Sequence, residues 1–130
     1  MNARACLGWT LFAGALLTAG CQRLNEERTM SLLPGESKHL IFSAPAYEQK
    51  LTVQVSSPGA PVSAWLVRES DSEAAQDQLQ KNKSPDAPLA GKEKAEDITL
   101  DTTIPAKTGY ILFIRAEQKR AEVKVKVTGR

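Results

Sequence analysis

The stretch Gly109–Thr128, GYILFIRAEQKRAEVKVKVT, holds two different β-strand patterns joined by a short polar segment. Its first part is apolar at both alternating sets of positions from Tyr110 to Ile114, which predicts a central strand over residues 109–116 that is buried on both faces. Its last eight residues alternate valine with Lys124 and Lys126, which predicts a strand with one buried face. We expect the exposed lysines to mark this second strand as a sheet edge, because edge strands often carry charges that discourage pairing with other chains.

Strand-like patterns also occupy most of the chain upstream of this stretch. Residues 50–56 (KLTVQVS) alternate apolar and polar side chains, and proline-glycine turn signals separate the neighbouring segments. The further strand candidates are 30–33, 38–43, 62–68 and 97–104. Short strands at this spacing predict an all-β fold, an antiparallel β-sandwich of about six to eight strands.

Residues 70–96 interrupt the strand rhythm and form an expected insertion. Ser70 with Glu73 three places later fits a capping box, which predicts a short helix over residues 73–81 with Ala75 and Leu79 on one face. Residues 82–95 are polar and contain two prolines, so we expect a surface loop there.

The first twenty residues have the three parts of an export signal. Arg4 provides the positive region, residues 7–17 (LGWTLFAGALL) are apolar, and small residues lead to Gly20. An apolar core of about a dozen residues is short for a membrane span, which needs roughly 20. We therefore expect residues 1–20 to be a signal helix that is removed, which leaves Cys21 as the only cysteine of the mature chain.

Residues 17–21 (LTAGC) resemble the lipobox of bacterial lipoproteins, with Thr18 where that family usually has leucine. The resemblance implies that the Cys21 thiol receives diacylglycerol, that cleavage falls between Gly20 and Cys21, and that the new amine is acylated, for example with palmitate. Two or more acyl chains hold a protein stably on a membrane. Gln22, in place of the aspartate that retains such proteins at the inner membrane, implies the outer membrane in a Gram-negative cell.

The expected mature chain has a polar tether at residues 21–29, which includes the lipidated cysteine, and a sandwich domain at residues 30–129. The order of features in this domain resembles small jelly-roll sandwiches related to the bacterial pre-peptidase C-terminal domains. The features that carry the resemblance are Leu33-Pro34-Gly35-Glu36, Phe42-Ser43-Ala44-Pro45, Ile104-Pro105-Ala106, the apolar run 110–114 and the final Val-x-Val-x-Val. The resemblance implies a non-catalytic module that helps with targeting, ligand contact or assembly.

Composition and residue chemistry argue against catalysis and against nucleic-acid binding. The mature chain has 16 basic and 15 acidic side chains without a concentrated basic face. His39 is the only histidine, so a histidine-based nucleophile or a two-histidine zinc site is excluded within one chain. Acidic residues gather at 69–77, where a solvated helix start and a Ca²⁺ site are alternatives. We expect no enzyme activity, no cofactor and no bound metal.

Two aromatic residues are the candidate ligand contacts. Trp65 is expected either in the core of the sandwich or on an exposed face, where it would form with Tyr47 a platform for sugar stacking or protein contact. The basic residues within 118–126 belong either to a solvated turn and strand or to a surface that contacts anionic lipid.

Together these features predict a lipid-anchored protein of the bacterial cell envelope that binds a protein partner, with the 70–96 insertion providing contacts. A glycan- or peptidoglycan-binding module is the alternative, and a small hydrolase is a third possibility that ranks below both.

Overall fold

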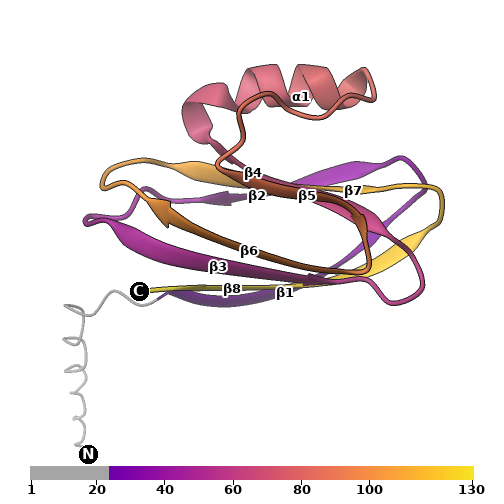
Figure 1. The fold of residues 1–130 in the computed structure, drawn as a ribbon, viewed down its shortest axis with the longest axis horizontal. Helices are drawn as coiled ribbons and strands as arrows, with labels where there is room; N and C mark the ends of the chain where they lie inside the picture. The colour runs from indigo at the N-terminus through magenta and orange to yellow at the C-terminus, as the bar shows by residue number, and fades with distance from the viewer. Residues whose placement is uncertain (1–23) are drawn as a thin grey trace, which may run out of the picture.

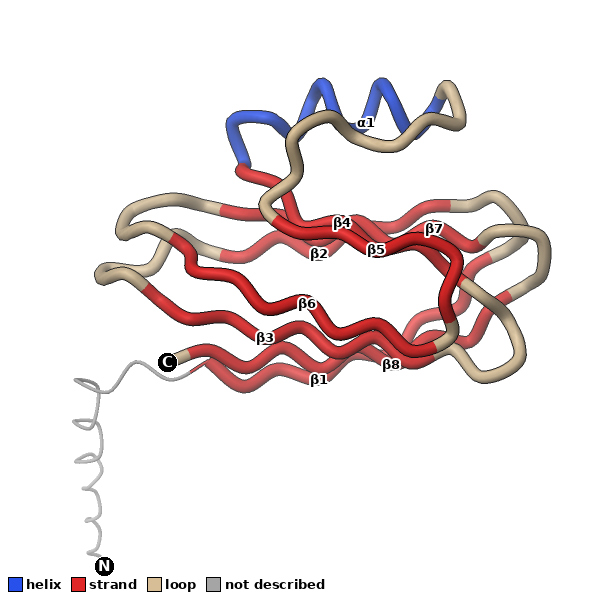
Figure 2. The backbone as a smooth tube through the Cα atoms, in the orientation of Figure 1, coloured by secondary structure: helices blue, strands red, loops and turns tan. Residues whose placement is uncertain are grey.

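The computed structural model describes residues 24–130, which form two four-stranded antiparallel sheets packed face to face, with one helix outside (Figures 1 and 2). The strand orders are β1-β8-β3-β6 and β2-β7-β4-β5, the arrangement of an eight-stranded jelly roll. This confirms the predicted all-β sandwich. The elements are β1 (Leu24–Leu32), β2 (Ser37–Phe42), β3 (Gln49–Ser56), β4 (Val62–Arg68), a 3-10 turn (Glu69–Asp71), α1 (Ser72–Gln80), β5 (Ala90–Ala95), β6 (Asp97–Ile104), β7 (Tyr110–Ala116) and β8 (Ala121–Gly129).

The expected signal segment at residues 1–20, the expected cleavage position and Cys21 lie outside the described residues. Residues 24–29, expected to be a polar tether, instead form most of β1, which pairs with β8 along its whole length from Leu24 opposite Gly129 to Leu32 opposite Ala121. The polar sequence misled the prediction because β1 is an edge strand, and only its Leu32 is fully buried.

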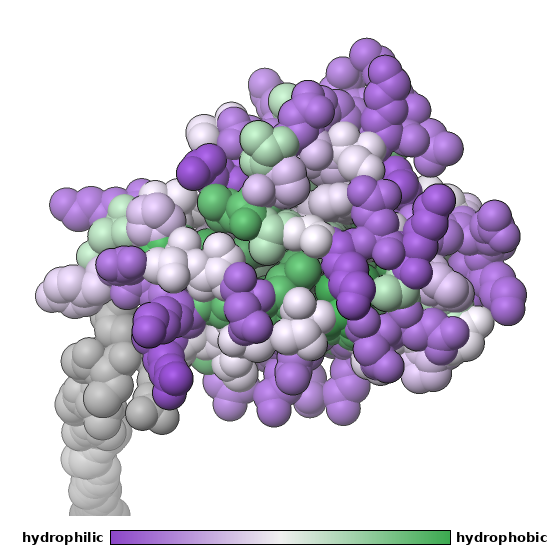
Figure 3. Space-filling view, viewed as in Figure 1, coloured by the Kyte–Doolittle hydropathy of each residue, from purple (hydrophilic) through white to green (hydrophobic). Residues whose placement is uncertain are grey.

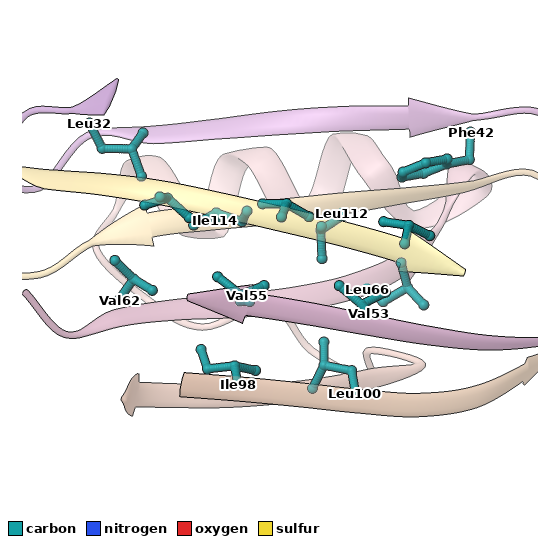
Figure 4. Close-up of a cluster of buried hydrophobic side chains, with 14 of the residues drawn as sticks. Leu32, Phe42, Val53, Val55, Val62, Leu66, Ile98, Leu100, Leu112 and Ile114 are labelled. Atoms are coloured by element: carbon teal, nitrogen blue, oxygen red, sulfur yellow. The ribbon is translucent and has the colours of Figure 1, made fainter. Parts of the chain in front are cut away.

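The hydrophobic core fills the space between the two sheets (Figure 4). In β3 and β8 every second side chain points into it, which follows from the two-residue period of the strand. The labelled side chains in Figure 4 come from both sheets and meet in one layer: Leu32, Phe42, Val53, Val55, Val62, Leu66, Ile98, Leu100, Leu112 and Ile114.

Strand β7 is central, between β2 and β4, as its sequence predicts. It is buried on both faces because the core between the sheets covers one face and the cluster with α1 covers the other. Strand β8 is also central, between β1 and β3, so the prediction that it forms an edge was wrong. Lys124 and Lys126 are exposed because they point away from the core, and exposure across a sheet face does not distinguish a central strand from an edge.

Strand β1, one of the two edges of the sheet β1-β8-β3-β6, carries charges on the side that faces the core. Glu26 and Arg28 lie on this side of the strand, and Asn25 and Glu27 lie on the other. Arg28 Nη2 is 3.2 Å from Glu26 Oε1, so the two side chains form an ion pair. Charged side chains on this side of an edge strand make pairing with another sheet unfavourable.

The 70–96 insertion contains one more strand than expected. Residues 90–95 form β5, which pairs with β4, although the register shifts between Val62 and Ala64 and Lys94 adopts a positive φ of 55°. The prolines lie before this strand, so they do not interrupt its hydrogen bonding.

Helix α1 forms but does not begin with the predicted capping box. Its N-cap is Asp71, without a side-chain hydrogen bond, and the 3-10 turn precedes it. The position at which α1 begins is determined by the backbone just after β4, because the Glu69 amide donates a hydrogen bond to the Gly109 carbonyl at 2.9 Å. Ala75 and Leu79 are buried on one face, as predicted. No helix within residues 24–130 is both long and apolar enough to cross a bilayer.

Gly91 in β5 lies against the indole of Trp65, its partner in β4. A Cβ at position 91 would stand 2.6 Å from Trp65 Cδ1, much closer than van der Waals contact allows. The absence of a side chain at Gly91 therefore allows β5 to pair beside the tryptophan.

We expect Gly91→Ala to lower the free energy of unfolding by about 1–3 kcal/mol, because either the indole or the strand must shift. Urea denaturation measures this cost. In a Trp65→Leu background the same glycine substitution should cost much less. An equal cost in both backgrounds would contradict a steric conflict with the indole.

Candidate functional site

Trp65 lies on the outer face of β4, beneath α1, and is only 2% exposed. It belongs to a second apolar cluster between sheet and helix, separate from the core between the sheets: Trp65, Val67, Ala75, Leu79, Ile111 and Phe113. The expectation of burial is therefore correct but for a different layer, and an exposed Trp65 stacking surface does not exist while α1 is in place.

A buried polar network that was not predicted from the sequence lies beside this cluster. Arg115 is 7% exposed, with its guanidinium 5.0 Å from the centre of the Trp65 ring and its Nε 3.5 Å from Glu117 Oε2. Arg115 Nη1 also donates to the Lys83 carbonyl at 3.4 Å, and the Ser63 hydroxyl donates to Glu117 at 2.6 Å. A buried guanidinium needs such partners, and here they fasten the insertion to the sheet. An arginine within the apolar run of β7 was the available signal.

Tyr47 and His39 are both exposed. Tyr47 is 73% exposed and lies in the connection between β2 and β3. It does not form the expected exposed pair with Trp65, since Trp65 is covered. His39 lies on the outer face of edge strand β2, where its ring centre is 5.7 Å from that of Phe113.

The acidic residues at 69–77 are distributed over the 3-10 turn and the helix. Asp71 Oδ2 lies 4.0 Å from Arg68 Nη1, and Asp77 Oδ2 lies 3.1 Å from Lys81 Nζ. Among residues 24–130, no group of three or more histidine, cysteine, aspartate or glutamate side chains is placed to hold a metal ion.

No helix of residues 24–130 covers the outer face of the sheet β1-β8-β3-β6, which we call the polar face (Figure 1). Rows of hydroxyl, amide and charged side chains cross it in register. Gln54 lies beside Lys126 on β8 and Thr99 on β6. Lys124 Nζ is 3.5 Å from Glu27 Oε2, so part of this charge is paired within the face.

An open groove of about 730 Å³ lies at one end of the polar face. Its polar lining comes from four strands and Arg130, and the Thr52 hydroxyl donates to Asp101 Oδ1 at 2.7 Å. A second hollow of about 520 Å³ lies further along the same face, beside Gln54 and Thr99. Such linings can hydrogen-bond a polar ligand, and the described residues that line the groove include no histidine or cysteine.

The groove opens at the end of the sandwich where β1 begins, which we call the β1 end. Leu24 and Leu51 both lie opposite Gly129 there, and the connections 43–48 and 105–109 cross between the sheets. Tyr110 is buried at this end and stacks on Phe42 with ring centres 5.0 Å apart. Burial, with a smaller contribution from the negative charge of Glu26, raises the pKa of Tyr110 to about 12.

The folded domain is similar to two solved structures. The pre-peptidase C-terminal domain of a collagenase from Bacillus anthracis superimposes with a TM-score of 0.60 and 16% identity, over 80% of this chain and 89% of that one. The Yersinia pseudotuberculosis-derived mitogen gives a TM-score of 0.57 and 9% identity, over 81% and 85%. The sequence matches no family model and no curated protein. At these identities the likeness concerns the fold, and it confirms the predicted resemblance to pre-peptidase C-terminal sandwiches at that level.

Helix α1 should shield Trp65, the only tryptophan among residues 24–130. We expect Leu79→Asp to detach the helix, because the substitution places a charge in the apolar cluster. Tryptophan emission should shift to longer wavelength, and acrylamide should quench it more strongly. Gln76→Asp, on an exposed position of the same helix, is the matched control and should leave the spectrum unchanged. Unchanged emission in Leu79→Asp would contradict the shielding.

Stability should fall as the pH rises from about 10 to 12, because the Tyr110 hydroxyl ionises in the unfolded chain at about pH 10 and in the folded chain only near 12. This contribution is fully present below pH 10. Tyr110→Phe cannot ionise, so its urea midpoint should decline less over this interval. Exposed Tyr47→Phe is the control and should follow the parent protein. Parallel declines in Tyr110→Phe and the parent would refute the assignment.

Proposed function

We propose that this chain is a lipoprotein of the bacterial cell envelope, anchored through lipid on Cys21, whose β-sandwich is a non-catalytic module that binds a protein partner. The observation that carries the proposal is the direct continuation of the lipobox-like segment into folded structure. Only residues 22 and 23 separate Cys21 from the first residue of β1. An anchor there would hold a complete domain at the membrane surface.

The polar face is the proposed binding surface of this module. Much of the 70–96 insertion, which was expected to provide contacts, has a structural role: β5 extends one sheet, and α1 covers Trp65 and Phe113. No described helix covers the polar face, and its groove and second hollow offer hydrogen-bonding groups to a partner.

Binding is favoured over catalysis because the groove presents hydroxyl, amide and charged groups without a histidine or cysteine among its described lining residues. A glycan or peptidoglycan ligand is the second candidate. The row of threonines and Asn25 in the groove supports it, since sugars are recognised through such hydrogen bonds. Burial of Trp65 removes the stacking surface that first suggested this alternative.

Cys21→Ser should abolish incorporation of a palmitate analogue and release the protein from the membrane fraction, because no acyl chains remain to hold it. Labelling followed by membrane fractionation measures both effects. A Cys21→Ser protein that still sediments with membranes would contradict the lipid anchor.

The partner is sought by photo-crosslinking in cells with the native anchor present. A crosslinking residue replaces Gln54 on the polar face or, as the matched control, Gln76 on α1; both positions are exposed. The proposal expects one dominant protein product from position 54 and none from position 76. Product from position 76 alone would assign the contacts to the insertion, and wall material alone would favour the glycan alternative; both results would contradict the polar face as a protein-binding surface.

A further inference from the structure

The β1 end gathers exposed groups suited to a lipid headgroup layer. Tyr47, 73% exposed, projects from the connection 43–48. Lys107 lies in the connection 105–109, and its amide donates to the Pro45 carbonyl at 2.7 Å, which joins the two connections. Lys50 is exposed at the start of β3.

Arg130 adds a further cation to this end and is held in place by the backbone. The Lys50 amide donates to the Arg130 carbonyl at 2.8 Å, and the Arg130 amide donates to the Lys50 carbonyl at 3.0 Å. The β1 end thus carries cations from three separate segments around one exposed tyrosine, on a base fixed by backbone hydrogen bonds.

The β1 end carries charged residues of both signs. The cations are Lys50, Arg68, Lys107 and Arg130, and the carboxylates are Glu26, Glu48, Glu69, Asp71 and Asp101. Three of the carboxylates have partners: Glu26 lies 3.2 Å from Arg28, Asp71 lies 4.0 Å from Arg68, and Asp101 accepts a hydrogen bond from the Thr52 hydroxyl. Lys50, Lys107 and Arg130 form no ion pair within residues 24–130, so their charges are available to an anionic surface.

The chain itself limits how far the β1 end can lie from an anchor at Cys21. Three residue steps join Cys21 to Leu24, and these can span at most about 11 Å in any conformation. A domain held this close meets the headgroups at high effective concentration, so weak contacts are enough to orient it.

We propose that the β1 end docks on an anionic phospholipid surface, with Tyr47 among the headgroups and Lys50, Lys107 and Arg130 against their phosphates. The inference rests on the lipid anchor of the proposed function. Tyrosine is favoured at membrane interfaces because one end of its ring is apolar and the other is polar, and lysine and arginine are attracted to anionic leaflets. In the docked state the strands would run roughly perpendicular to the membrane plane.

This orientation determines what a partner can reach. The nine residues of β1 span roughly 30 Å, so Leu33, at the opposite end, would lie about that far from the headgroups. Because the strands of the polar face run along the long axis of the domain (Figure 1), this face would lie parallel to the membrane normal.

The test uses the full lipidated protein in vesicles of phosphatidylethanolamine and phosphatidylglycerol. The lipid occupies the Cys21 thiol, so Ala46→Cys, next to Tyr47 and exposed, offers a single thiol for a fluorophore. Leu33→Cys, 58% exposed, is the matched site at the opposite end. Quenching by headgroup-attached nitroxide lipid reports proximity, and a short tether alone would make it stronger at position 46.

Docking adds a dependence on charge and on the tyrosine. We expect quenching at position 46 to fall at least twofold with Lys50→Gln/Lys107→Gln, with Tyr47→Ser, or when phosphatidylcholine replaces phosphatidylglycerol. Lys119→Gln/Arg120→Gln at the opposite end should change nothing. Quenching that is unaffected by all three changes would overturn docking while the anchor stands. Mass spectrometry of the N-terminal peptide separates this from a failure of the proposed function, because an unlipidated Cys21 would refute the anchor and the docking together.

Discussion

Burial of β7 on both of its faces is the constraint on which the rest of the structure depends. Its inward side chains close the core against the facing sheet, and its outward side chains Ile111 and Phe113 need a separate cover. Helix α1 covers them with Ala75 and Leu79. An uncovered outer face would expose a large aromatic and aliphatic area to water, which folded single domains avoid. The insertion between β4 and β5 is therefore part of the fold's hydrophobic organisation.

This arrangement determines which surfaces of the domain are available for function, and Figure 3 shows one side of that surface. In the view shown, polar side chains surround small apolar areas on the side where β5 and β6 lie. One sheet is occupied by the helix, and Arg115 fastens the following loop to it through the Lys83 carbonyl. The other sheet keeps an open polar face. Because both first and last strands lie in this second sheet, the groove and the β1 end are adjacent, and an anchor before β1 would bring both close to a membrane.

The errors of prediction have a common physical origin. Exposed lysines on alternate positions of β8 show only that one face meets solvent; they carry no information about whether hydrogen-bonding partners lie on one side or both. The polar residues of β1 looked like a tether because an edge strand tolerates charge on both faces. The capping-box pattern of Ser70 and Glu73 is present in the sequence, but the chain leaves β4 in a 3-10 turn that contains Ser70, and Asp71 is the N-cap of α1. Local pattern yields to tertiary pairing in each case.

The sequence by itself determined the class of fold, the strands at 50–56 and 110–116 and the buried face of α1, because these follow from periodicity within short windows. Its lipobox-like segment also located the proposed anchor. Only the tertiary structure decided which strands are edges, that Trp65 lies under α1 instead of between the sheets, and that Arg115 is buried with Glu117. It also decided that Tyr47, Lys50, Lys107 and Arg130 share one end of the sandwich. These facts depend on contacts between residues far apart in the chain, and such contacts leave no mark in any single segment of sequence.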